Sequence, residues 1–108
     1  RRAVLALVLV AVACPGLATE PAAARRIVTL APHLAELAYA AGAGDRLVAT
    51  VAFSDEPAAA RALPRVGDAF RVDYERIAAL RPDLILGWPS GNSVAVLDRL
   101  RGLGLRVV

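Results

Sequence analysis

Short apolar blocks alternate with segments of helical periodicity along most of the chain. The blocks are rich in Val, Ile and Leu and have few charges, which is typical of buried strands. They predict strands at residues 27–30, 47–53, 84–86 and 105–108, with a further short strand near Val66. The segments between them predict helices at residues 32–41, 58–62, 74–80 and 94–103. This alternation indicates an α/β fold, a parallel sheet with flanking helices joined by right-handed crossovers.

The predicted helices carry recognisable start and stop signals. Pro32 occupies a favoured first-turn position, and the glycines of residues 42–44 end the same helix. Asp73 is expected to cap the 74–80 helix, and Pro82 to end it by forcing Arg81 into an extended conformation. Asn92 or Ser93 is expected to cap the last helix.

Helical spacing also predicts which side chains face the sheet. In the first helix the expected inner face is Leu34, Leu37, Ala38 and Ala41. In the 74–80 helix and just beyond, it is Tyr74, Ile77, Ala78 and Arg81. In the last helix it is Val96, Leu97, Leu100 and Leu103.

The first residues have the composition of a secretory signal. Arg1 and Arg2 precede an uncharged apolar run at residues 3–13 that is too short to span a bilayer. We expect residues 1–18 to be a signal peptide truncated at its start and cleaved after Ala18. Residues 19–25 then form a Pro/Ala linker. The chain is expected to be a fragment that is incomplete at both ends.

Residues 11–14 offer a second interpretation of the same region. Ala-Val-Ala-Cys resembles a lipoprotein box, in which Cys14 would be acylated and anchor the protein to a membrane surface. Both interpretations place the mature protein outside the cytoplasm. After Ala18 the sequence contains no cysteine, which excludes a disulfide scaffold and a thiolate metal site from residues 19–108.

The charge gives no sign of a nucleic-acid partner. All 13 basic residues are arginines, and removal of Arg1 and Arg2 lowers the formal charge from +3 to +1. Acidic side chains are interspersed with the basic ones throughout. A domain that binds nucleic acid normally carries a clustered positive surface, so we expect no such partner.

The most informative chemistry lies where the predicted strands end. In open α/β sheets, ligands bind beyond the carboxyl ends of the parallel strands. The 47–53 strand ends at Phe53, and the 84–86 strand is followed by Trp88, the only tryptophan, and a turn. The long connection after Phe53 adds Phe70. The candidate ligand contacts are Phe53, Phe70, Trp88, Pro89, Gly91 and Asn92.

Other functional classes fit the sequence less well. A dinucleotide enzyme would need a glycine-rich turn after the first strand, which is instead followed by Ala-Pro-His. A hydrolase built from His33, Ser54 and Asp55 would lack the G-x-S-x-G turn. A metal contact from His33 would lack a second ligand, and a metal-cluster enzyme component would need cysteines.

Several motifs taken together resemble one family. RIVTLAPHLAELAYAAGAG (26–44), FSDEP (53–57), RVDYERIAALRPDLILGW (71–88) and SGN (90–92) are similar to the periplasmic substrate-binding proteins for cobalamin, whose wider family also takes iron siderophores and haem. The resemblance covers residues 26–108. It implies the first lobe of a two-lobe, class III binding protein, whose lobes are joined by one long helix.

The resemblance implies a transport function without catalysis or a resident cofactor. We expect a periplasmic, monomeric receptor that captures cobalamin or a related corrinoid and delivers it to the permease of an ABC importer. An iron-siderophore or haem receptor of the same family is the alternative. The spectrum of the purified protein with cobalamin or with ferric chelates would distinguish them.

Individual positions take their expected roles from the same resemblance. Phe53 stands where cobalamin binders have a tyrosine, Trp88 stands at a ligand-stacking tryptophan, and Glu75 matches the acidic residue that docks on permease arginines. Two positions depart from the pattern. Ala69 stands where the cobalamin binders have a pocket tryptophan, so either neighbouring Phe70 takes its place or the pocket accepts another ligand. Ala31 stands where relatives often have a capping serine.

Overall fold

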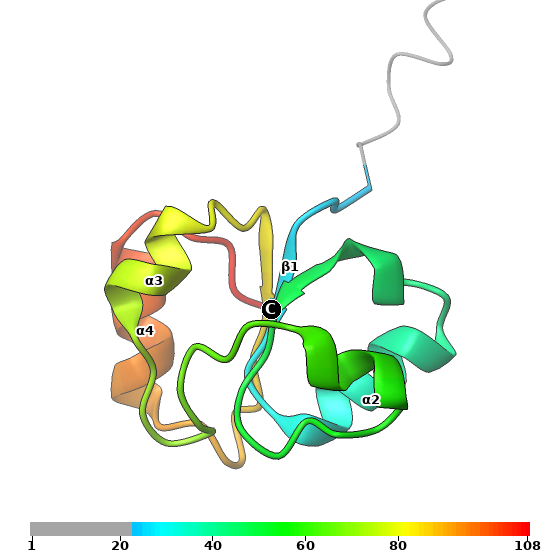
Figure 1. Cartoon of the computed structure of the whole chain (residues 1–108). Coiled ribbons are helices and arrows are strands. Elements are labelled where there is room, and N and C mark those ends of the chain that lie inside the picture. Colours follow the sequence, from blue (N-terminus) through cyan, green and yellow to red (C-terminus); the bar gives the residue numbers. More distant parts are fainter. Residues whose placement is uncertain (1–22) are drawn as a thin grey trace, which may run out of the picture.

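Three parallel strands form the centre of the structure, a computed structural model that describes residues 23–108 (Figure 1). The elements are β1 (Ile27–Thr29), α2 (Pro32–Ala40), η1 (Gly44–Arg46), β2 (Leu47–Ala49), η2 (Ala58–Ala62), α3 (Tyr74–Ala79), β3 (Leu84–Leu86) and α4 (Val94–Gly102). The predicted signal peptide 1–18, its Cys14 and the first part of the 19–25 linker lie outside the described residues. Within 23–108, no helix combines the length and apolar character that membrane crossing requires.

The predicted α/β architecture is confirmed. The strand order is β2-β1-β3, and β1 pairs in parallel with both neighbours. The 47–53 strand is shorter than predicted, because after Ala49 the chain makes only a single bridge at Thr50 and then turns. The strands expected near Val66 and at 105–108 are likewise reduced to single bridges, Thr50 to Arg65 and Ile85 to Val107.

Helices cover both faces of the sheet, so the apolar strands are buried on both sides (Figure 1). On one face, α3 and α4 pack through Ile77, Val96, Leu97 and Leu100. On the other face, α2 packs through two alanines. This burial explains why the strand sequences are continuously apolar rather than alternating.

The predicted inner face of α2 is correct for Ala38 and wrong for Leu37 and Ala41. Ala35 and Ala38 are buried, whereas Leu37 is 59% exposed and Ala41 is also exposed. The small alanine side chains turn toward the sheet, and Tyr39 packs beside them. Helical spacing alone could not choose between two overlapping apolar stripes that differ by one residue.

The other two helix faces need smaller corrections. In α3 only Ile77 is fully buried, Tyr74 packs partly buried against the same core, and Ala78 is exposed. Arg81 is also exposed, because it lies beyond the end of the helix. In α4 the buried residues are Val96, Leu97 and Leu100. Leu103 is exposed because it follows the last turn of that helix.

The helix termini mostly follow the sequence signals. Asp73 caps α3, its side chain accepting a hydrogen bond from the Arg76 amide at 3.1 Å. Ser93, rather than Asn92, caps α4. The expected extended conformation of Arg81 is wrong: its φ is +51°, so the chain leaves α3 through a left-handed residue before Pro82.

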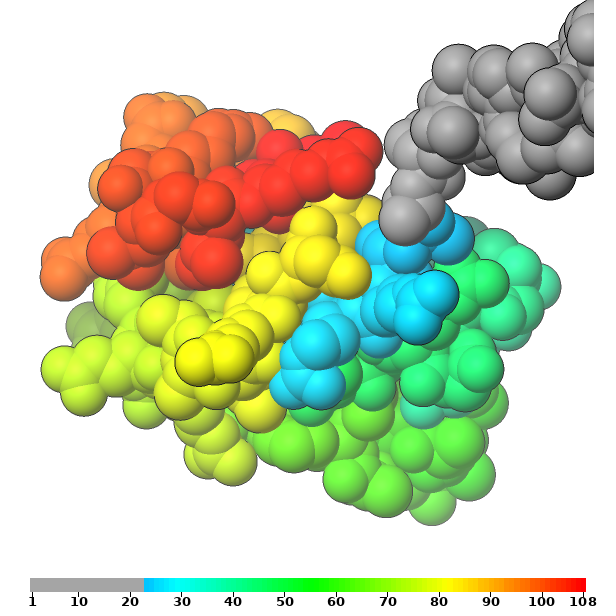
Figure 2. All heavy atoms as spheres, turned by 90° about the horizontal axis from the view of Figure 1, so that it is seen from above, coloured from blue at the N-terminus to red at the C-terminus, as the bar shows by residue number. Residues whose placement is uncertain are grey.

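One carboxylate fastens the start of β1 to the start of β3. Asp83 accepts hydrogen bonds from the amides of Arg25 and Arg26 at 2.9–3.1 Å, while the Arg26 side chain donates to the carbonyl of Leu80. Figure 2 shows residues 23–27 (blue) against the yellow segment near residue 80. The amide hydrogen bonds lower the pKa of Asp83 below its ordinary value of 3.8.

We expect Asp83→Asn to reduce the acid sensitivity of this lobe. Because the folded pKa is lowered, the stabilisation is complete above pH 3.8 and is lost as the pH falls through the folded value. Urea unfolding of the complete protein between pH 2.5 and about 6 measures this dependence. The control is Asp98→Asn, which removes only an exposed contact with Arg101. Equal pH slopes for wild type and Asp83→Asn would contradict this role.

Candidate functional site

A cavity of about 420 Å³ opens where the carboxyl ends of the strands meet. Its walls are Pro32, His33, Ala52, Phe53, Asp68, Ala69, Phe70 and Trp88. The structure therefore brings together the three aromatic side chains that the sequence singled out, together with His33. Pro89, Gly91 and Asn92, the other predicted contacts, do not line this cavity.

Trp88 is half-buried, and its indole lies against two neighbours. The ring meets the His33 imidazole in a T-shaped arrangement, with centroids 4.9 Å apart and an interplanar angle of 78°. Gly91 lies under the other part of the indole, where an added Cβ would overlap the ring carbons. Gly91 thus supports Trp88 by having no side chain, which is a different role from ligand contact.

Asn92 is 2% exposed and its side chain is engaged within the protein. Its Oδ1 accepts a hydrogen bond from the Trp88 amide at 2.6 Å. Its Nδ2 donates to the carbonyls of Leu30 at 3.0 Å and Ala69 at 2.7 Å. The side chain is therefore committed to the backbone of three segments that carry or precede cavity residues.

Phe53 extends from a constrained loop. Its φ is +70°, an unusual conformation for a residue with a bulky side chain, and 80% of its surface is exposed. The next residue, Ser54, is buried and accepts a hydrogen bond from Thr50 Oγ1 at 2.8 Å, and Thr50 accepts from Thr29 at 2.7 Å. Arg65 donates to the Ser54 carbonyl at 3.0 Å. These contacts hold Phe53 outward at the cavity.

Phe70 lies at the tip of a tight turn built by Asp68. The Asp68 carboxylate accepts hydrogen bonds from the amides of Phe70 and Arg71, both at 2.8 Å, and these bonds lower its pKa. The turn closes through a bridge between Gly67 and Val72. With 70% of its surface exposed, the Phe70 ring remains available to a ligand.

The cavity does not bring together the Ser54 and His33 side chains of the hydrolase considered above. Ser54 is buried and bonded to Thr50, so it does not join His33 in the cavity wall. Within residues 23–108 no group of three or more His, Cys, Asp or Glu side chains could hold a metal ion. Glu75 is exposed on the first turn of α3 and lines neither of the cavities described here.

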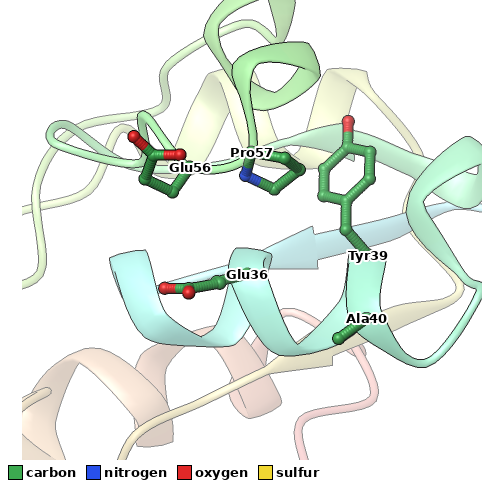
Figure 3. Close-up of a pocket in the computed structure, with 5 residues that line it drawn as sticks. All are labelled: Glu36, Tyr39, Ala40, Glu56 and Pro57. Carbon is green, nitrogen blue, oxygen red and sulfur yellow. The ribbon is translucent and has the colours of Figure 1, made fainter.

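A second hollow lies between α2 and the residues before η2 (Figure 3). It measures about 330 Å³ and is lined by Glu36, Tyr39, Ala40, Glu56 and Pro57. Glu56 also contacts Arg61 at 3.8 Å, and both side chains are largely exposed. Because only one aromatic ring borders this hollow, it offers a planar apolar ligand less contact than the first cavity does.

Sequence reasoning missed the residues that hold the cavity together. Asp68 could have been recognised from its position two residues before Phe70, since Asp side chains commonly accept from nearby amides in turns. Thr29 and Thr50 lie in apolar strands, where they looked like ordinary β-branched residues. Their bonding becomes visible only when the strands are side by side.

The sequence of residues 27–108 matches the family model described as periplasmic binding protein. The chain is 47% identical over 93 residues to the vitamin B12-binding protein of Vibrio cholerae serotype O1, covering 86% of this chain and 34% of that protein. It is 50% identical over 92 residues to the vitamin B12-binding protein of Yersinia pestis, covering 84% and 33%. The chain thus spans about a third of the length of these relatives.

Solved structures agree with the sequence comparison. The crystal structure of the periplasmic vitamin B12-binding protein of Vibrio cholerae matches with a TM-score of 0.75 and 48% identity, covering 79% of this chain and 33% of that one. A periplasmic haem-binding protein from Pseudomonas aeruginosa matches with a TM-score of 0.73 and 34% identity, covering 80% and 31%. Two of the three kinds of relative named by the resemblance, the vitamin B12 binders and the haem binders, are therefore similar to this chain.

We expect Gly91→Ala to displace the Trp88 indole, because the added methyl would occupy the space of its ring. The measurement is the near-ultraviolet circular dichroism and emission of Trp88, taken as the difference between each protein and its Trp88→Phe counterpart. The control is Gly102→Ala, where an added Cβ meets no atom within 4 Å. An unchanged Trp88 signal in Gly91→Ala would show that the indole does not rest on this glycine.

Proposed function

The chain belongs to the periplasmic binding protein family, and from that premise we propose that it forms the ligand-capturing first lobe of a cobalamin receptor. The receptor would take up cobalamin or a related corrinoid outside the cytoplasm and deliver it to an ABC importer, without catalysing a reaction. Its ligand, its partner and its second lobe are parts of this proposal. The vitamin B12-binding relatives support the choice of ligand.

The observation that carries the proposal is the three-ring wall of the cavity. Phe53, Phe70 and Trp88 come from three separate loops and converge at one edge of the sheet. A large, partly apolar macrocycle can cover such rings and remove their apolar surface from water. Because Phe53 and Phe70 are more than two-thirds exposed, one lobe contacts the ligand from one side only, and the proposed second lobe would cover the other.

The 89–92 turn contributes differently from the sequence-based expectation. The amides of Gly91 and Asn92 both donate to the carbonyl of Trp88, so they hold the turn rather than face a ligand. In this proposal, Pro89 and Ser90, which are exposed, are the residues of the turn that could meet ligand side groups. Gly91 and Asn92 act on the ligand through the placement of Trp88.

Ala69, which stands where the cobalamin binders have a tryptophan, fills less of the same cavity than that larger side chain would. Ala69 lines the wall beside Phe70, whose ring is largely exposed. We propose that Phe70 supplies the apolar contact at this position. The ligand would therefore rest on a phenyl ring at a slightly different place than in receptors with a tryptophan at position 69.

A haem or iron-siderophore receptor is the second candidate. It is favoured by the similarity to a haem-binding structure and by the placement of His33 on the cavity wall, since an imidazole can coordinate haem iron. The two candidates differ in the absorption spectrum of the loaded protein. A shifted Soret band after addition of ferric haem, with no calorimetric response to cyanocobalamin, would favour haem.

Delivery to the importer is proposed to use Glu75. Its carboxylate lies on the exposed first turn of α3, away from the ligand cavity, where it can meet the arginines of a permease. Charge pairs of this kind mainly steer association and fix its orientation. The proposed location is the periplasm, the compartment named for the family and for the solved relatives.

For Trp88→Ala in the complete protein we expect about tenfold weaker binding of cyanocobalamin. One aromatic contact contributes roughly 0.5–1.5 kcal/mol beyond area burial, and about 1.4 kcal/mol corresponds to tenfold. Isothermal titration calorimetry measures the change. The matched control is Leu37→Ala, which removes an exposed apolar side chain of α2 outside the cavity. If both variants bind as tightly as wild type, the cavity is not the binding site.

For Glu75→Gln we expect unchanged cyanocobalamin affinity and reduced transport. The substitution keeps the size of the side chain and removes the charge proposed to pair with the permease. Uptake of labelled cobalamin in cells measures transport, and Glu36→Gln, an exposed glutamate of α2, is the control. Wild-type uptake by Glu75→Gln would assign docking to another surface.

A further inference from the structure

Three loops of the cavity meet at one buried side chain. Leu30 immediately precedes the segment that carries Pro32 and His33, Ala69 adjoins Phe70, and Trp88 provides the largest ring. These segments are 39 and 19 residues apart in sequence. The Asn92 amide is hydrogen-bonded to the backbone of all three, at 3.0, 2.7 and 2.6 Å respectively.

The three backbone groups around the Asn92 side chain need one acceptor and two donors, which a side-chain amide provides. The Trp88 amide is a donor, so it needs an acceptor, while the carbonyls of Leu30 and Ala69 need donors. A primary amide supplies one acceptor and two donors in one plane. An aspartate at position 92 would keep the acceptor but place an oxygen against the two carbonyls, and a serine would be too short to reach all three.

The main chain of Asn92 strengthens the same arrangement. Its backbone amide donates to the Trp88 carbonyl at 2.7 Å. Asn92 therefore bonds to both the N–H and the C=O of Trp88. The Leu30 amide donates to the carbonyl of Leu86 at 3.1 Å, which fixes the first loop to β3. The rings of the cavity are thus mounted on a backbone frame, and Asn92 is the side chain common to its three parts.

We propose that Asn92 is the positioning residue of the ligand cavity: it sets the spacing between Trp88, Phe70 and the His33 segment without touching the ligand. The expected effect of Asn92 on ligand affinity rests on the proposed function. The expected effect of Asn92 on the three loops does not depend on any ligand. It assigns Asn92 a role different from the ligand contact that its place in the turn predicts.

The test substitutes Asn92→Asp in the complete protein. At pH 7.5 we expect at least tenfold weaker binding of cyanocobalamin, because the buried carboxylate repels the carbonyls of Leu30 and Ala69. Burial and the two carbonyls favour the protonated carboxyl of this variant, because its O–H can donate to one of the carbonyls. The affinity should therefore recover in part at pH 5. Wild type measured at both values accounts for the nearby titratable groups, His33 and Asp68.

The matched control is Ser93→Ala, at the neighbouring position. Ser93 caps α4, and its hydroxyl accepts from the Val96 amide within that helix, so its loss should lower the stability of the protein while leaving the affinity for cyanocobalamin close to the wild-type value. A residue that acts only through stability would give the same affinity in both variants. Equal affinities for Asn92→Asp and Ser93→Ala would overturn the proposal.

Hydrogen exchange without ligand provides the second readout. In Asn92→Asp, peptides covering residues 30–33, 69–72 and 88–92 should exchange faster together, while peptides of α3 keep the wild-type rate. Unchanged exchange in the three segments would overturn the proposal. If wild type fails to bind cyanocobalamin, the proposed function fails, and exchange still decides the role of Asn92. Should Asn92→Asp not fold, Asn92→Ser removes the amide without adding a charge and is measured in the same way.

Discussion

Parallel pairing of β1 with both β2 and β3 is the constraint on which the rest of the structure depends. Because all three strands run in one direction, every loop that follows a strand emerges at the same edge of the sheet. Phe53 and Trp88, which are 35 residues apart in sequence, therefore face one cavity. An antiparallel pairing would send one of these rings to the opposite edge. The layers of helices protect this arrangement by covering both faces of the sheet (Figure 1).

The loops at this edge are held by polar contacts rather than by burial of their aromatic side chains. Asp68 fixes the turn before Phe70, Thr29 donates to Thr50 and Thr50 donates to Ser54, and Asn92 joins three segments. A typical hydrogen bond contributes about 1 kcal/mol net, but an unpaired buried partner costs more. The polar side chains can therefore fix the loops while the rings remain free. This division of roles explains why large apolar surfaces are exposed in an otherwise well-packed lobe.

Strong local signals in the sequence predicted much of the fold. Apolar blocks gave the three strands, Asp73 gave the start of α3, and the strand ends gave the position of the cavity. The failures have a common physical cause. Which stripe of α2 faces the sheet depends on how closely alanines allow the helix to approach, and the bonding of Asn92 depends on residues up to 62 positions away. Neither is encoded in local spacing, so neither could be found before the chain was folded.

The left-handed conformation of Phe53 restricts how this wall of the cavity can change during evolution. A β-branched residue would fit this backbone poorly, and glycine or asparagine would fit it but abandon the ring. Among substitutions that keep an aromatic ring at position 53, the smallest is the gain of a phenolic hydroxyl in Phe53→Tyr. Position 69 has no positive φ and carries only a methyl group toward the cavity, so it can change size more freely. The shape of the cavity can therefore change through the neighbours of the Phe53 ring more easily than through the ring itself.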